Sequence, residues 1–162
     1  PLKTEEYAEL VNHGLNGVIC FQENNNKARY NIYHPRGMKS KFEWRVNGFD
    51  RMGQAGVHSI GMGVLIGLED WRTDVTMMLI TALPAKTLLE NQIQRKLPRM
   101  RPAENEGPTE RNHGDKELAQ VTFAMRIFDH DVDNLLYREP ANIRDHMATL
   151  GVTTMSAESK TR

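Results

Sequence analysis

Short apolar runs separated by amphipathic stretches are the main pattern along the chain. The runs Gly17 to Phe21 and His58 to Met62 have the length and the two-sided apolarity of strands buried in a parallel sheet. Val132 to Tyr137 and Val152 to Met155 predict two more strands, and a weaker signal around Leu97 suggests a doubtful fifth. The pattern therefore predicts four or five short strands spread over the whole length.

Helix signals lie between these runs. The predicted helices occupy residues 4–14, 47–56, 70–83, 115–127 and 140–151. Pro84 is expected to end the third helix because proline lacks the backbone N–H that the next turn needs. The polar segment from Gln22 to Lys41 predicts a long loop, and residues 84–112 give no clear pattern.

Strands that alternate with helices indicate an α/β fold with parallel strands and covering helices. At 162 residues the chain is expected to form one domain, residues 1–162, without a second. In parallel sheets, ligands bind beyond the carboxyl ends of the strands. The polar residues that follow the predicted strands are therefore candidates for a binding site; they are Gln22, Glu23, Glu69, Arg72, Arg99, Arg101, Arg138, Glu139 and Ser156.

Composition narrows the function classes. The 21 basic and 21 acidic residues cancel, which argues against a dedicated nucleic-acid or anionic-membrane binder. No apolar run is long enough to span a bilayer, so no membrane partner is expected. The single cysteine, Cys20, cannot form an internal disulfide, and a cytoplasmic location is expected. The six histidines show no zinc spacing, and no metal site is expected in this chain.

Several candidates also have plain structural interpretations. Arg138 and Glu139 could form an ion pair at the start of a helix, and Arg99 with Arg101 could be a solvated loop pair. Arg45 could pack on the neighbouring Trp44. Ser156 could be an ordinary hydrogen-bonded strand end, and the basic, tyrosine-containing segment 27–41 is more simply a solvated loop than a nucleic-acid contact.

Two glycines lie in the predicted strand that ends near Leu65. Gly61 and Gly63 lack side chains, so this strand is expected to leave room for a bulky ligand.

Five blocks of the sequence, in order, resemble the 2-iminoacetate synthase family, the radical S-adenosylmethionine tyrosine lyases of thiamine biosynthesis. The blocks are YHPRGMKSKFEWR, AGVHSIGMGVLIGLEDWR, PRMRPAENEG, YREPANIRDHM and LGVTTMSAESKT. The tyrosine lyase that matures [FeFe]-hydrogenase is a close relative of this family and an alternative identity. The resemblance implies that the chain is the C-terminal part of a TIM-type (β/α) barrel that is incomplete in this chain.

The resemblance also implies the chemistry. In similar enzymes a [4Fe-4S] cluster, held by a CxxxCxxC run, cleaves S-adenosylmethionine, and the resulting radical leads to cleavage of the Cα–Cβ bond of L-tyrosine into 2-iminoacetate and p-cresol. The positions implied for S-adenosylmethionine are Gln22, Glu23, Arg45, Val64 and Leu65. The positions implied for the substrate are Arg99, Arg101, Arg138 and Ser156. A thiazole synthase is the implied partner.

The chain departs from the family at one decisive point. It contains no CxxxCxxC run, so the cluster ligands are expected upstream and this chain alone is expected to be inactive. A non-catalytic α/β binding module, or a degenerate fragment, is therefore the second hypothesis. A nucleic-acid contact through residues 27–41 ranks last.

Overall fold

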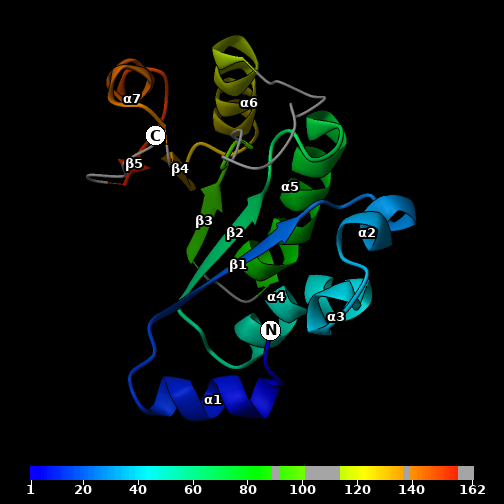
Figure 1. Ribbon diagram of the computed structural model, residues 1–162. Coiled ribbons are helices and arrows are strands. Elements are labelled where there is room, and N and C mark those ends of the chain that lie inside the picture. The colour runs from blue at the N-terminus through cyan, green and yellow to red at the C-terminus, as the bar shows by residue number, and fades with distance from the viewer. Residues whose placement is uncertain (89–91, 101–113, 137–138, 157–162) are drawn as a thin grey trace.

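The fold is built on one sheet of five parallel strands (Figure 1). The computed structural model describes residues 1–88, 92–100, 114–136 and 139–156, with the side chains of 83–88 left aside. The strands are paired in sequence order, β1 to β5. Their bounds are β1 Gly17–Glu23, β2 Ser59–Val64, β3 Gln92–Lys96, β4 Asp133–Leu136 and β5 Thr154–Met155.

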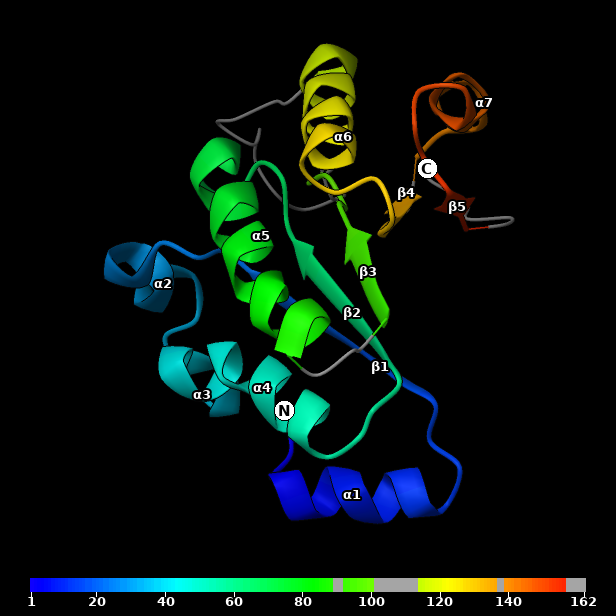
Figure 2. The same cartoon turned by 180° about the vertical axis from the view of Figure 1, so that it is seen from behind.

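Helices fill the connections, as parallel neighbours require. Their bounds are α1 Thr4–Asn12, α2 Lys27–Tyr33, η1 Met38–Ser40, α3 Phe42–Val46, α4 Gly48–Gln54, α5 Trp71–Leu88, α6 Asp115–Phe128 and α7 Ala141–Ala148. In Figure 1 β1 crosses in front of α5, and seen from behind α5 lies in front of β1 (Figure 2). Thus α5 covers one face of the sheet.

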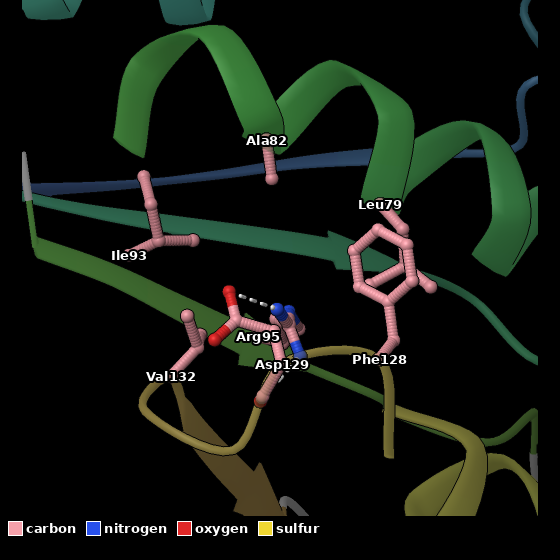
Figure 3. Close-up of a pocket in the computed structure, with 7 residues that line it drawn as sticks. All are labelled: Leu79, Ala82, Ile93, Arg95, Phe128, Asp129 and Val132. Carbon is pink, nitrogen blue, oxygen red and sulfur yellow. Dashed lines mark hydrogen bonds and ion pairs between the residues drawn. The ribbon is translucent and has the colours of Figure 1, made fainter. Parts of the chain in front are cut away.

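The strand register separates two faces of the sheet. Met62 pairs with Arg95, and Ile60 pairs with Ile93, on what we call the helix face. Leu79 and Ala82 of α5 surround Ile93 and Arg95 there (Figure 3). The intervening residues, which include Ile19, Phe21, Gly61, Gly63 and Lys96, point to the opposite side, which we call the open face. Ile19 on this face is 56% exposed, an apolar side chain without cover.

A buried ion pair completes the helix face. Arg95 is 1% exposed, and its Nη2 lies 3.2 Å from Oδ2 of Asp129, just after α6. Its Nη1 also donates to the carbonyl oxygen of Met125 at 3.1 Å. Burial lowers the pKa of Arg95, and the neighbouring Asp129 opposes that shift. The pair lets a polar strand, QIQRK, occupy the centre of the sheet.

This architecture confirms the predicted α/β class with parallel strands and covering helices. Within the described ranges β1 and β5 remain edge strands, so the sheet stays open. β3 confirms the doubtful strand, although it ends at Lys96, just before Leu97.

Two local predictions are wrong. The segment predicted as a long loop contains α2 and η1. The third helix does not stop at Leu83 but continues past Pro84 to Leu88. Proline in a helix interior removes one backbone hydrogen bond, and α5 continues past Pro84 despite that local preference.

Candidate functional site

The carboxyl ends of β1, β2 and β3 stay together beyond the strands. The Leu65 N–H donates to the carbonyl oxygen of Glu23 at 2.8 Å. The Ile66 N–H donates to Pro98 at 2.9 Å, and the Met100 N–H donates to Ile66 at 2.8 Å. These bonds bring the predicted positions Glu23, Leu65 and Arg99 to one edge of the sheet.

Glu23 lies at a distortion of the β1 end. The pairing with β2 shifts between Phe21 and Glu23, and Glu23 has a φ of 71°, which a non-glycine residue rarely adopts. Its carboxylate accepts a hydrogen bond from Lys39 Nζ at 2.5 Å and lies 3.4 Å from Nε2 of His34. Burial lowers the pKa of His34, and the charge of Lys39 adds to this effect. Such strain is typical of positions held in place by several contacts.

The segment that sequence analysis interpreted as a loop supplies the partners of a second carboxylate. Glu69 is buried, and Arg29 Nε of α2 donates to its Oε1 at 2.5 Å. The Tyr33 hydroxyl donates to the same oxygen at 2.6 Å. The spacing of Arg29 and Tyr33, one helical turn apart, is the signal that could have revealed α2.

Arg99 is the most strongly held predicted residue. It is 7% exposed, and its Nε donates to Oε1 of Glu139 at 2.7 Å while Nη2 donates to Oε2. Its Nη1 lies 2.9 Å from Oδ1 of Asp115. Burial opposes the charge of Arg99, but the two carboxylates outweigh burial and raise its pKa. The interpretation of Arg99 as a solvated loop residue is therefore wrong.

Arg45 contacts the backbone of β1 from α3, and Gln22 is a residue of β1 itself. Arg45 of α3 donates from Nη2 to the Phe21 carbonyl, and its buried Nε has no partner among the described residues. Arg51, rather than Arg45, stacks on Trp44, at 3.8 Å from the ring centroid. Gln22 is buried beside Phe49 and Met78 on the helix face, and neither atom of its amide has a partner there.

The remaining predicted positions differ in accessibility. Val64 is fully buried in the core, whereas Leu65 is partly exposed. The Ser156 N–H donates to Leu136 at 3.3 Å, and its carbonyl accepts from Arg144 at 2.7 Å. Arg101 and Arg138 lie outside the described residues, so their roles stay predictions.

The glycine positions of β2 are filled rather than vacant. A Cβ on Gly63 would lie 2.4 Å from the Phe21 ring and 2.8 Å from the Lys96 carbonyl oxygen. A Cβ on Gly61 would lie 2.8 Å from Ile19 and 3.0 Å from Lys96 Cε. The expectation that these glycines leave room for a ligand is corrected, because side chains of β1 and β3 occupy that space.

Metal and membrane signals are weak in the described part of the chain. It contains no cluster of three or more His, Cys, Asp or Glu side chains suited to a metal ion. Cys20 is a free, buried thiol in β1. None of the helices in the described ranges combines the length and the apolarity needed to cross a bilayer.

Comparison with known proteins gives a consistent set of relatives. The chain is 36% identical over 165 aligned residues to a 2-iminoacetate synthase of Salmonella typhimurium, and 35% identical to that of Escherichia coli. Both alignments cover the whole chain. The chain is a relative of the 2-iminoacetate synthases. No protein-family model matches it.

The chain spans 44% of the length of these 2-iminoacetate synthases, in their C-terminal portion. Two solved structures share its fold. A HydG described as a maturase of the [FeFe]-hydrogenase superposes with a TM-score of 0.88 at 26% identity, over 96% of this chain and 36% of its own. HydG from Carboxydothermus hydrogenoformans superposes with a TM-score of 0.89 at 30% identity, over 99% and 38%. These likenesses confirm the predicted relationship and the partial barrel.

Proposed function

We propose that the protein to which this chain belongs is a radical S-adenosylmethionine lyase that cleaves the Cα–Cβ bond of L-tyrosine into 2-iminoacetate and p-cresol. The observation that carries this proposal is 36% identity to a 2-iminoacetate synthase along the entire chain. The open parallel sheet supports it, because its carboxyl edge collects the polar side chains on which such a site depends.

The cluster does not fit this chain. A [4Fe-4S] cluster is ordinarily held by cysteine thiolates, and the sequence offers one cysteine, which is buried in β1. The ligands would have to come from another part of the polypeptide. The chain's own contribution would then be to bind and orient the small molecules at the sheet edge.

The β1 end offers groups that fit a polar cofactor. The unpartnered Nε–H of Arg45 could donate a new hydrogen bond, and the unpartnered amide of Gln22 could donate or accept one, without losing existing ones. We therefore retain Gln22, Glu23, Arg45 and Leu65 as contacts for S-adenosylmethionine. Val64 would act only indirectly, as part of the core beneath them.

The contacts of Arg99 limit its role in binding tyrosine. Arg99 already holds Glu139 and Asp115, so it could take a tyrosine carboxylate only by exchanging one of them. We propose that Arg99 instead positions the chain after β3 and β4, and that Arg101, Arg138 and Ser156 contact tyrosine. Transfer of 2-iminoacetate to a thiazole synthase remains part of the proposal.

A second candidate function is maturation of [FeFe]-hydrogenase. The observation that favours it is the close superposition on two HydG structures. The two functions share tyrosine cleavage and differ in the fate of its products, so product analysis separates them.

The test is tyrosine turnover by the native polypeptide, purified without oxygen from its source and supplied with S-adenosylmethionine and a reductant. We expect p-cresol to form only when S-adenosylmethionine is present, and glyoxylate, the hydrolysis product of 2-iminoacetate, to accumulate in equal amount. Glyoxylate well below p-cresol would favour the maturation function. Absence of p-cresol from a preparation with a full complement of iron and sulfide would contradict both and favour a non-catalytic module.

A further inference from the structure

The open face of the sheet carries a buried cation. Lys96 is the last residue of β3 and pairs with Gly63 in register, so its side chain leaves the sheet on the side opposite α5. The lysine side chain bends back over β2. A Cβ placed on Gly61 would lie 3.0 Å from the Lys96 Cε. Glycine at position 61 thus provides the trough in which the lysine lies. The residue is only 6% exposed.

No group within the described ranges neutralises this ammonium. Lys96 makes no ion pair or side-chain hydrogen bond with any described residue, and its Nζ, which is not among the fully buried atoms, keeps a narrow contact with solvent. Burial alone lowers its pKa, and no neighbouring carboxylate counteracts that shift.

Asp133, which the register places on this face, and Glu23, at the distorted end of β1, have other partners. Asp133, two register positions below the pairing of Lys96, accepts from the Thr153 hydroxyl at 3.0 Å. Glu23 is held by Lys39 and His34. Neither carboxylate therefore neutralises Lys96.

The two buried arginines of this region each have a carboxylate partner. Arg95 pairs with Asp129 on the helix face, and Arg99 pairs with Glu139 at the carboxyl edge. A lysine whose side chain is almost wholly buried without a counter-charge loses most of the hydration of its ammonium, whereas most lysines keep the charge in water. The cost of Lys96 would be offset if an anion bound beside it.

We propose that Lys96 Nζ binds the carboxylate of a small ligand on the open face of the sheet. The choice of ligand rests on the proposed function, since L-tyrosine and S-adenosylmethionine both carry an α-amino carboxylate. The partly buried Phe21 and the exposed Ile19 supply an apolar surface beside the ammonium for the rest of the ligand.

The first test is the pKa of Lys96 in the native polypeptide, measured by competitive labelling of amines followed by peptide mass spectrometry. The probes are L-tyrosine and S-adenosylmethionine, with tyramine and decarboxylated S-adenosylmethionine as matched controls that lack the carboxylate. We expect one carboxylate probe to raise the pKa by at least one unit and its control to leave the pKa unchanged. The probe that acts identifies the ligand.

The second test is affinity, measured by calorimetry on Lys96→Met, Lys96→Arg and the exposed control Lys116→Met. We expect at least a tenfold loss of affinity for the acting probe in Lys96→Met, partial retention in Lys96→Arg and no change in Lys116→Met. Lys96→Met is also expected to raise the melting temperature of the ligand-free protein, which separates a binding lysine from a structural one.

The outcomes distinguish the two proposals. If acetate raises the pKa of Lys96 while L-tyrosine and S-adenosylmethionine do not, the carboxylate site stands and the proposed function is weakened. The site is overturned if Lys96 has an ordinary pKa before any probe is added. It is also overturned if Lys96→Met binds every probe like the parent.

Discussion

Arg99 and Glu139, 40 residues apart in sequence, form a buried two-bond ion pair that ties the chain after β3 to the start of α7. Asp115, the first residue of α6, joins from a third direction. The β3–α6 connection, through Arg99 and Asp115, and the β4–α7 connection, through Glu139, therefore meet at one guanidinium. This arrangement makes Arg99 a fixed point of the fold.

Breaking this ion pair should lower the free energy of unfolding. Glu139→Gln removes one carboxylate from the buried Arg99 guanidinium while Asp115 stays beside it, and loss of one partner of a buried pair costs about 3 kcal/mol. The control is Lys27→Met, which removes the exposed Lys27–Glu43 pair and should change stability by less than about 1 kcal/mol. Urea unfolding of both variants measures the difference. Equal, small effects would show that the Arg99 pair contributes little.

Asp74 should make stability depend on pH. Burial raises its pKa from 3.8 to about 6, and the nearby charges of Glu69 and Asp70 add to the shift, although the Asn25 N–H donates to its Oδ1 at 2.6 Å. The folded state therefore holds a proton that the unfolded chain loses at lower pH. The stability from this proton is fully present below about pH 4 and is lost as pH rises to about 6.

Asp74→Asn removes this titration while keeping an oxygen that can accept from Asn25. At pH 7 the variant should be more stable than the parent by about 1 to 3 kcal/mol, with the difference shrinking toward pH 4. Thermal unfolding of both proteins across this range measures it. A constant difference at every pH would rule out Asp74 as the titrating group.

Gly63 should not tolerate a side chain. In Gly63→Ala the new Cβ would overlap the Phe21 ring and the Lys96 carbonyl oxygen, so we expect a loss of about 1 to 3 kcal/mol. Adding Phe21→Ala should recover part of that loss, because one of the two obstacles is removed. Urea unfolding of the single and double variants tests the overlap. Strictly additive losses would show that the ring is not the obstacle.

Replacing Arg45 should weaken the binding of S-adenosylmethionine and leave the binding of tyrosine unchanged. Its free Nε and its bond to the Phe21 carbonyl place it at the β1 end, so Arg45→Ala should weaken binding of S-adenosylmethionine about tenfold or more while tyrosine affinity stays unchanged. The exposed Arg36→Ala serves as the matched control. Calorimetric titration of the native polypeptide checks this. Equal S-adenosylmethionine affinity in Arg45→Ala and the parent would remove Arg45 from the site.

The strand and helix alternation was predictable because short apolar segments mark β1, β2 and β4. Only β2 buries a run of residues; in β1 Cys20 and Gln22 are buried and Ile19 is 56% exposed, so the two-sided burial expected there is wrong. β3 gave only a weak signal because Arg95 is buried through Asp129, a partner 34 residues away, and Lys96 through a glycine trough on β2. Pattern reading cannot anticipate such long-range compensation. α2 escaped detection because Tyr30 is its only buried residue, so its sequence lacks an apolar stripe.

The candidate site was predictable in outline only. The rule that ligands bind beyond strand ends selected Glu23 and Arg99, which do meet at one edge. The same rule could not predict that Glu139 would form an ion pair with Arg99. It also could not predict that Lys96, at the end of β3, would have no ion-pair partner among the described residues. Those properties depend on which side chains lie opposite one another after folding.

The most direct measurement is turnover of isotopically labelled tyrosine by the native polypeptide. Tyrosine with ¹³C at Cα and ²H at Cβ should give p-cresol that carries deuterium in its methyl group and glyoxylate that carries ¹³C. Both labels should appear only with S-adenosylmethionine present. Tyrosine recovered intact, or products that keep Cα and Cβ joined, would contradict cleavage of this bond.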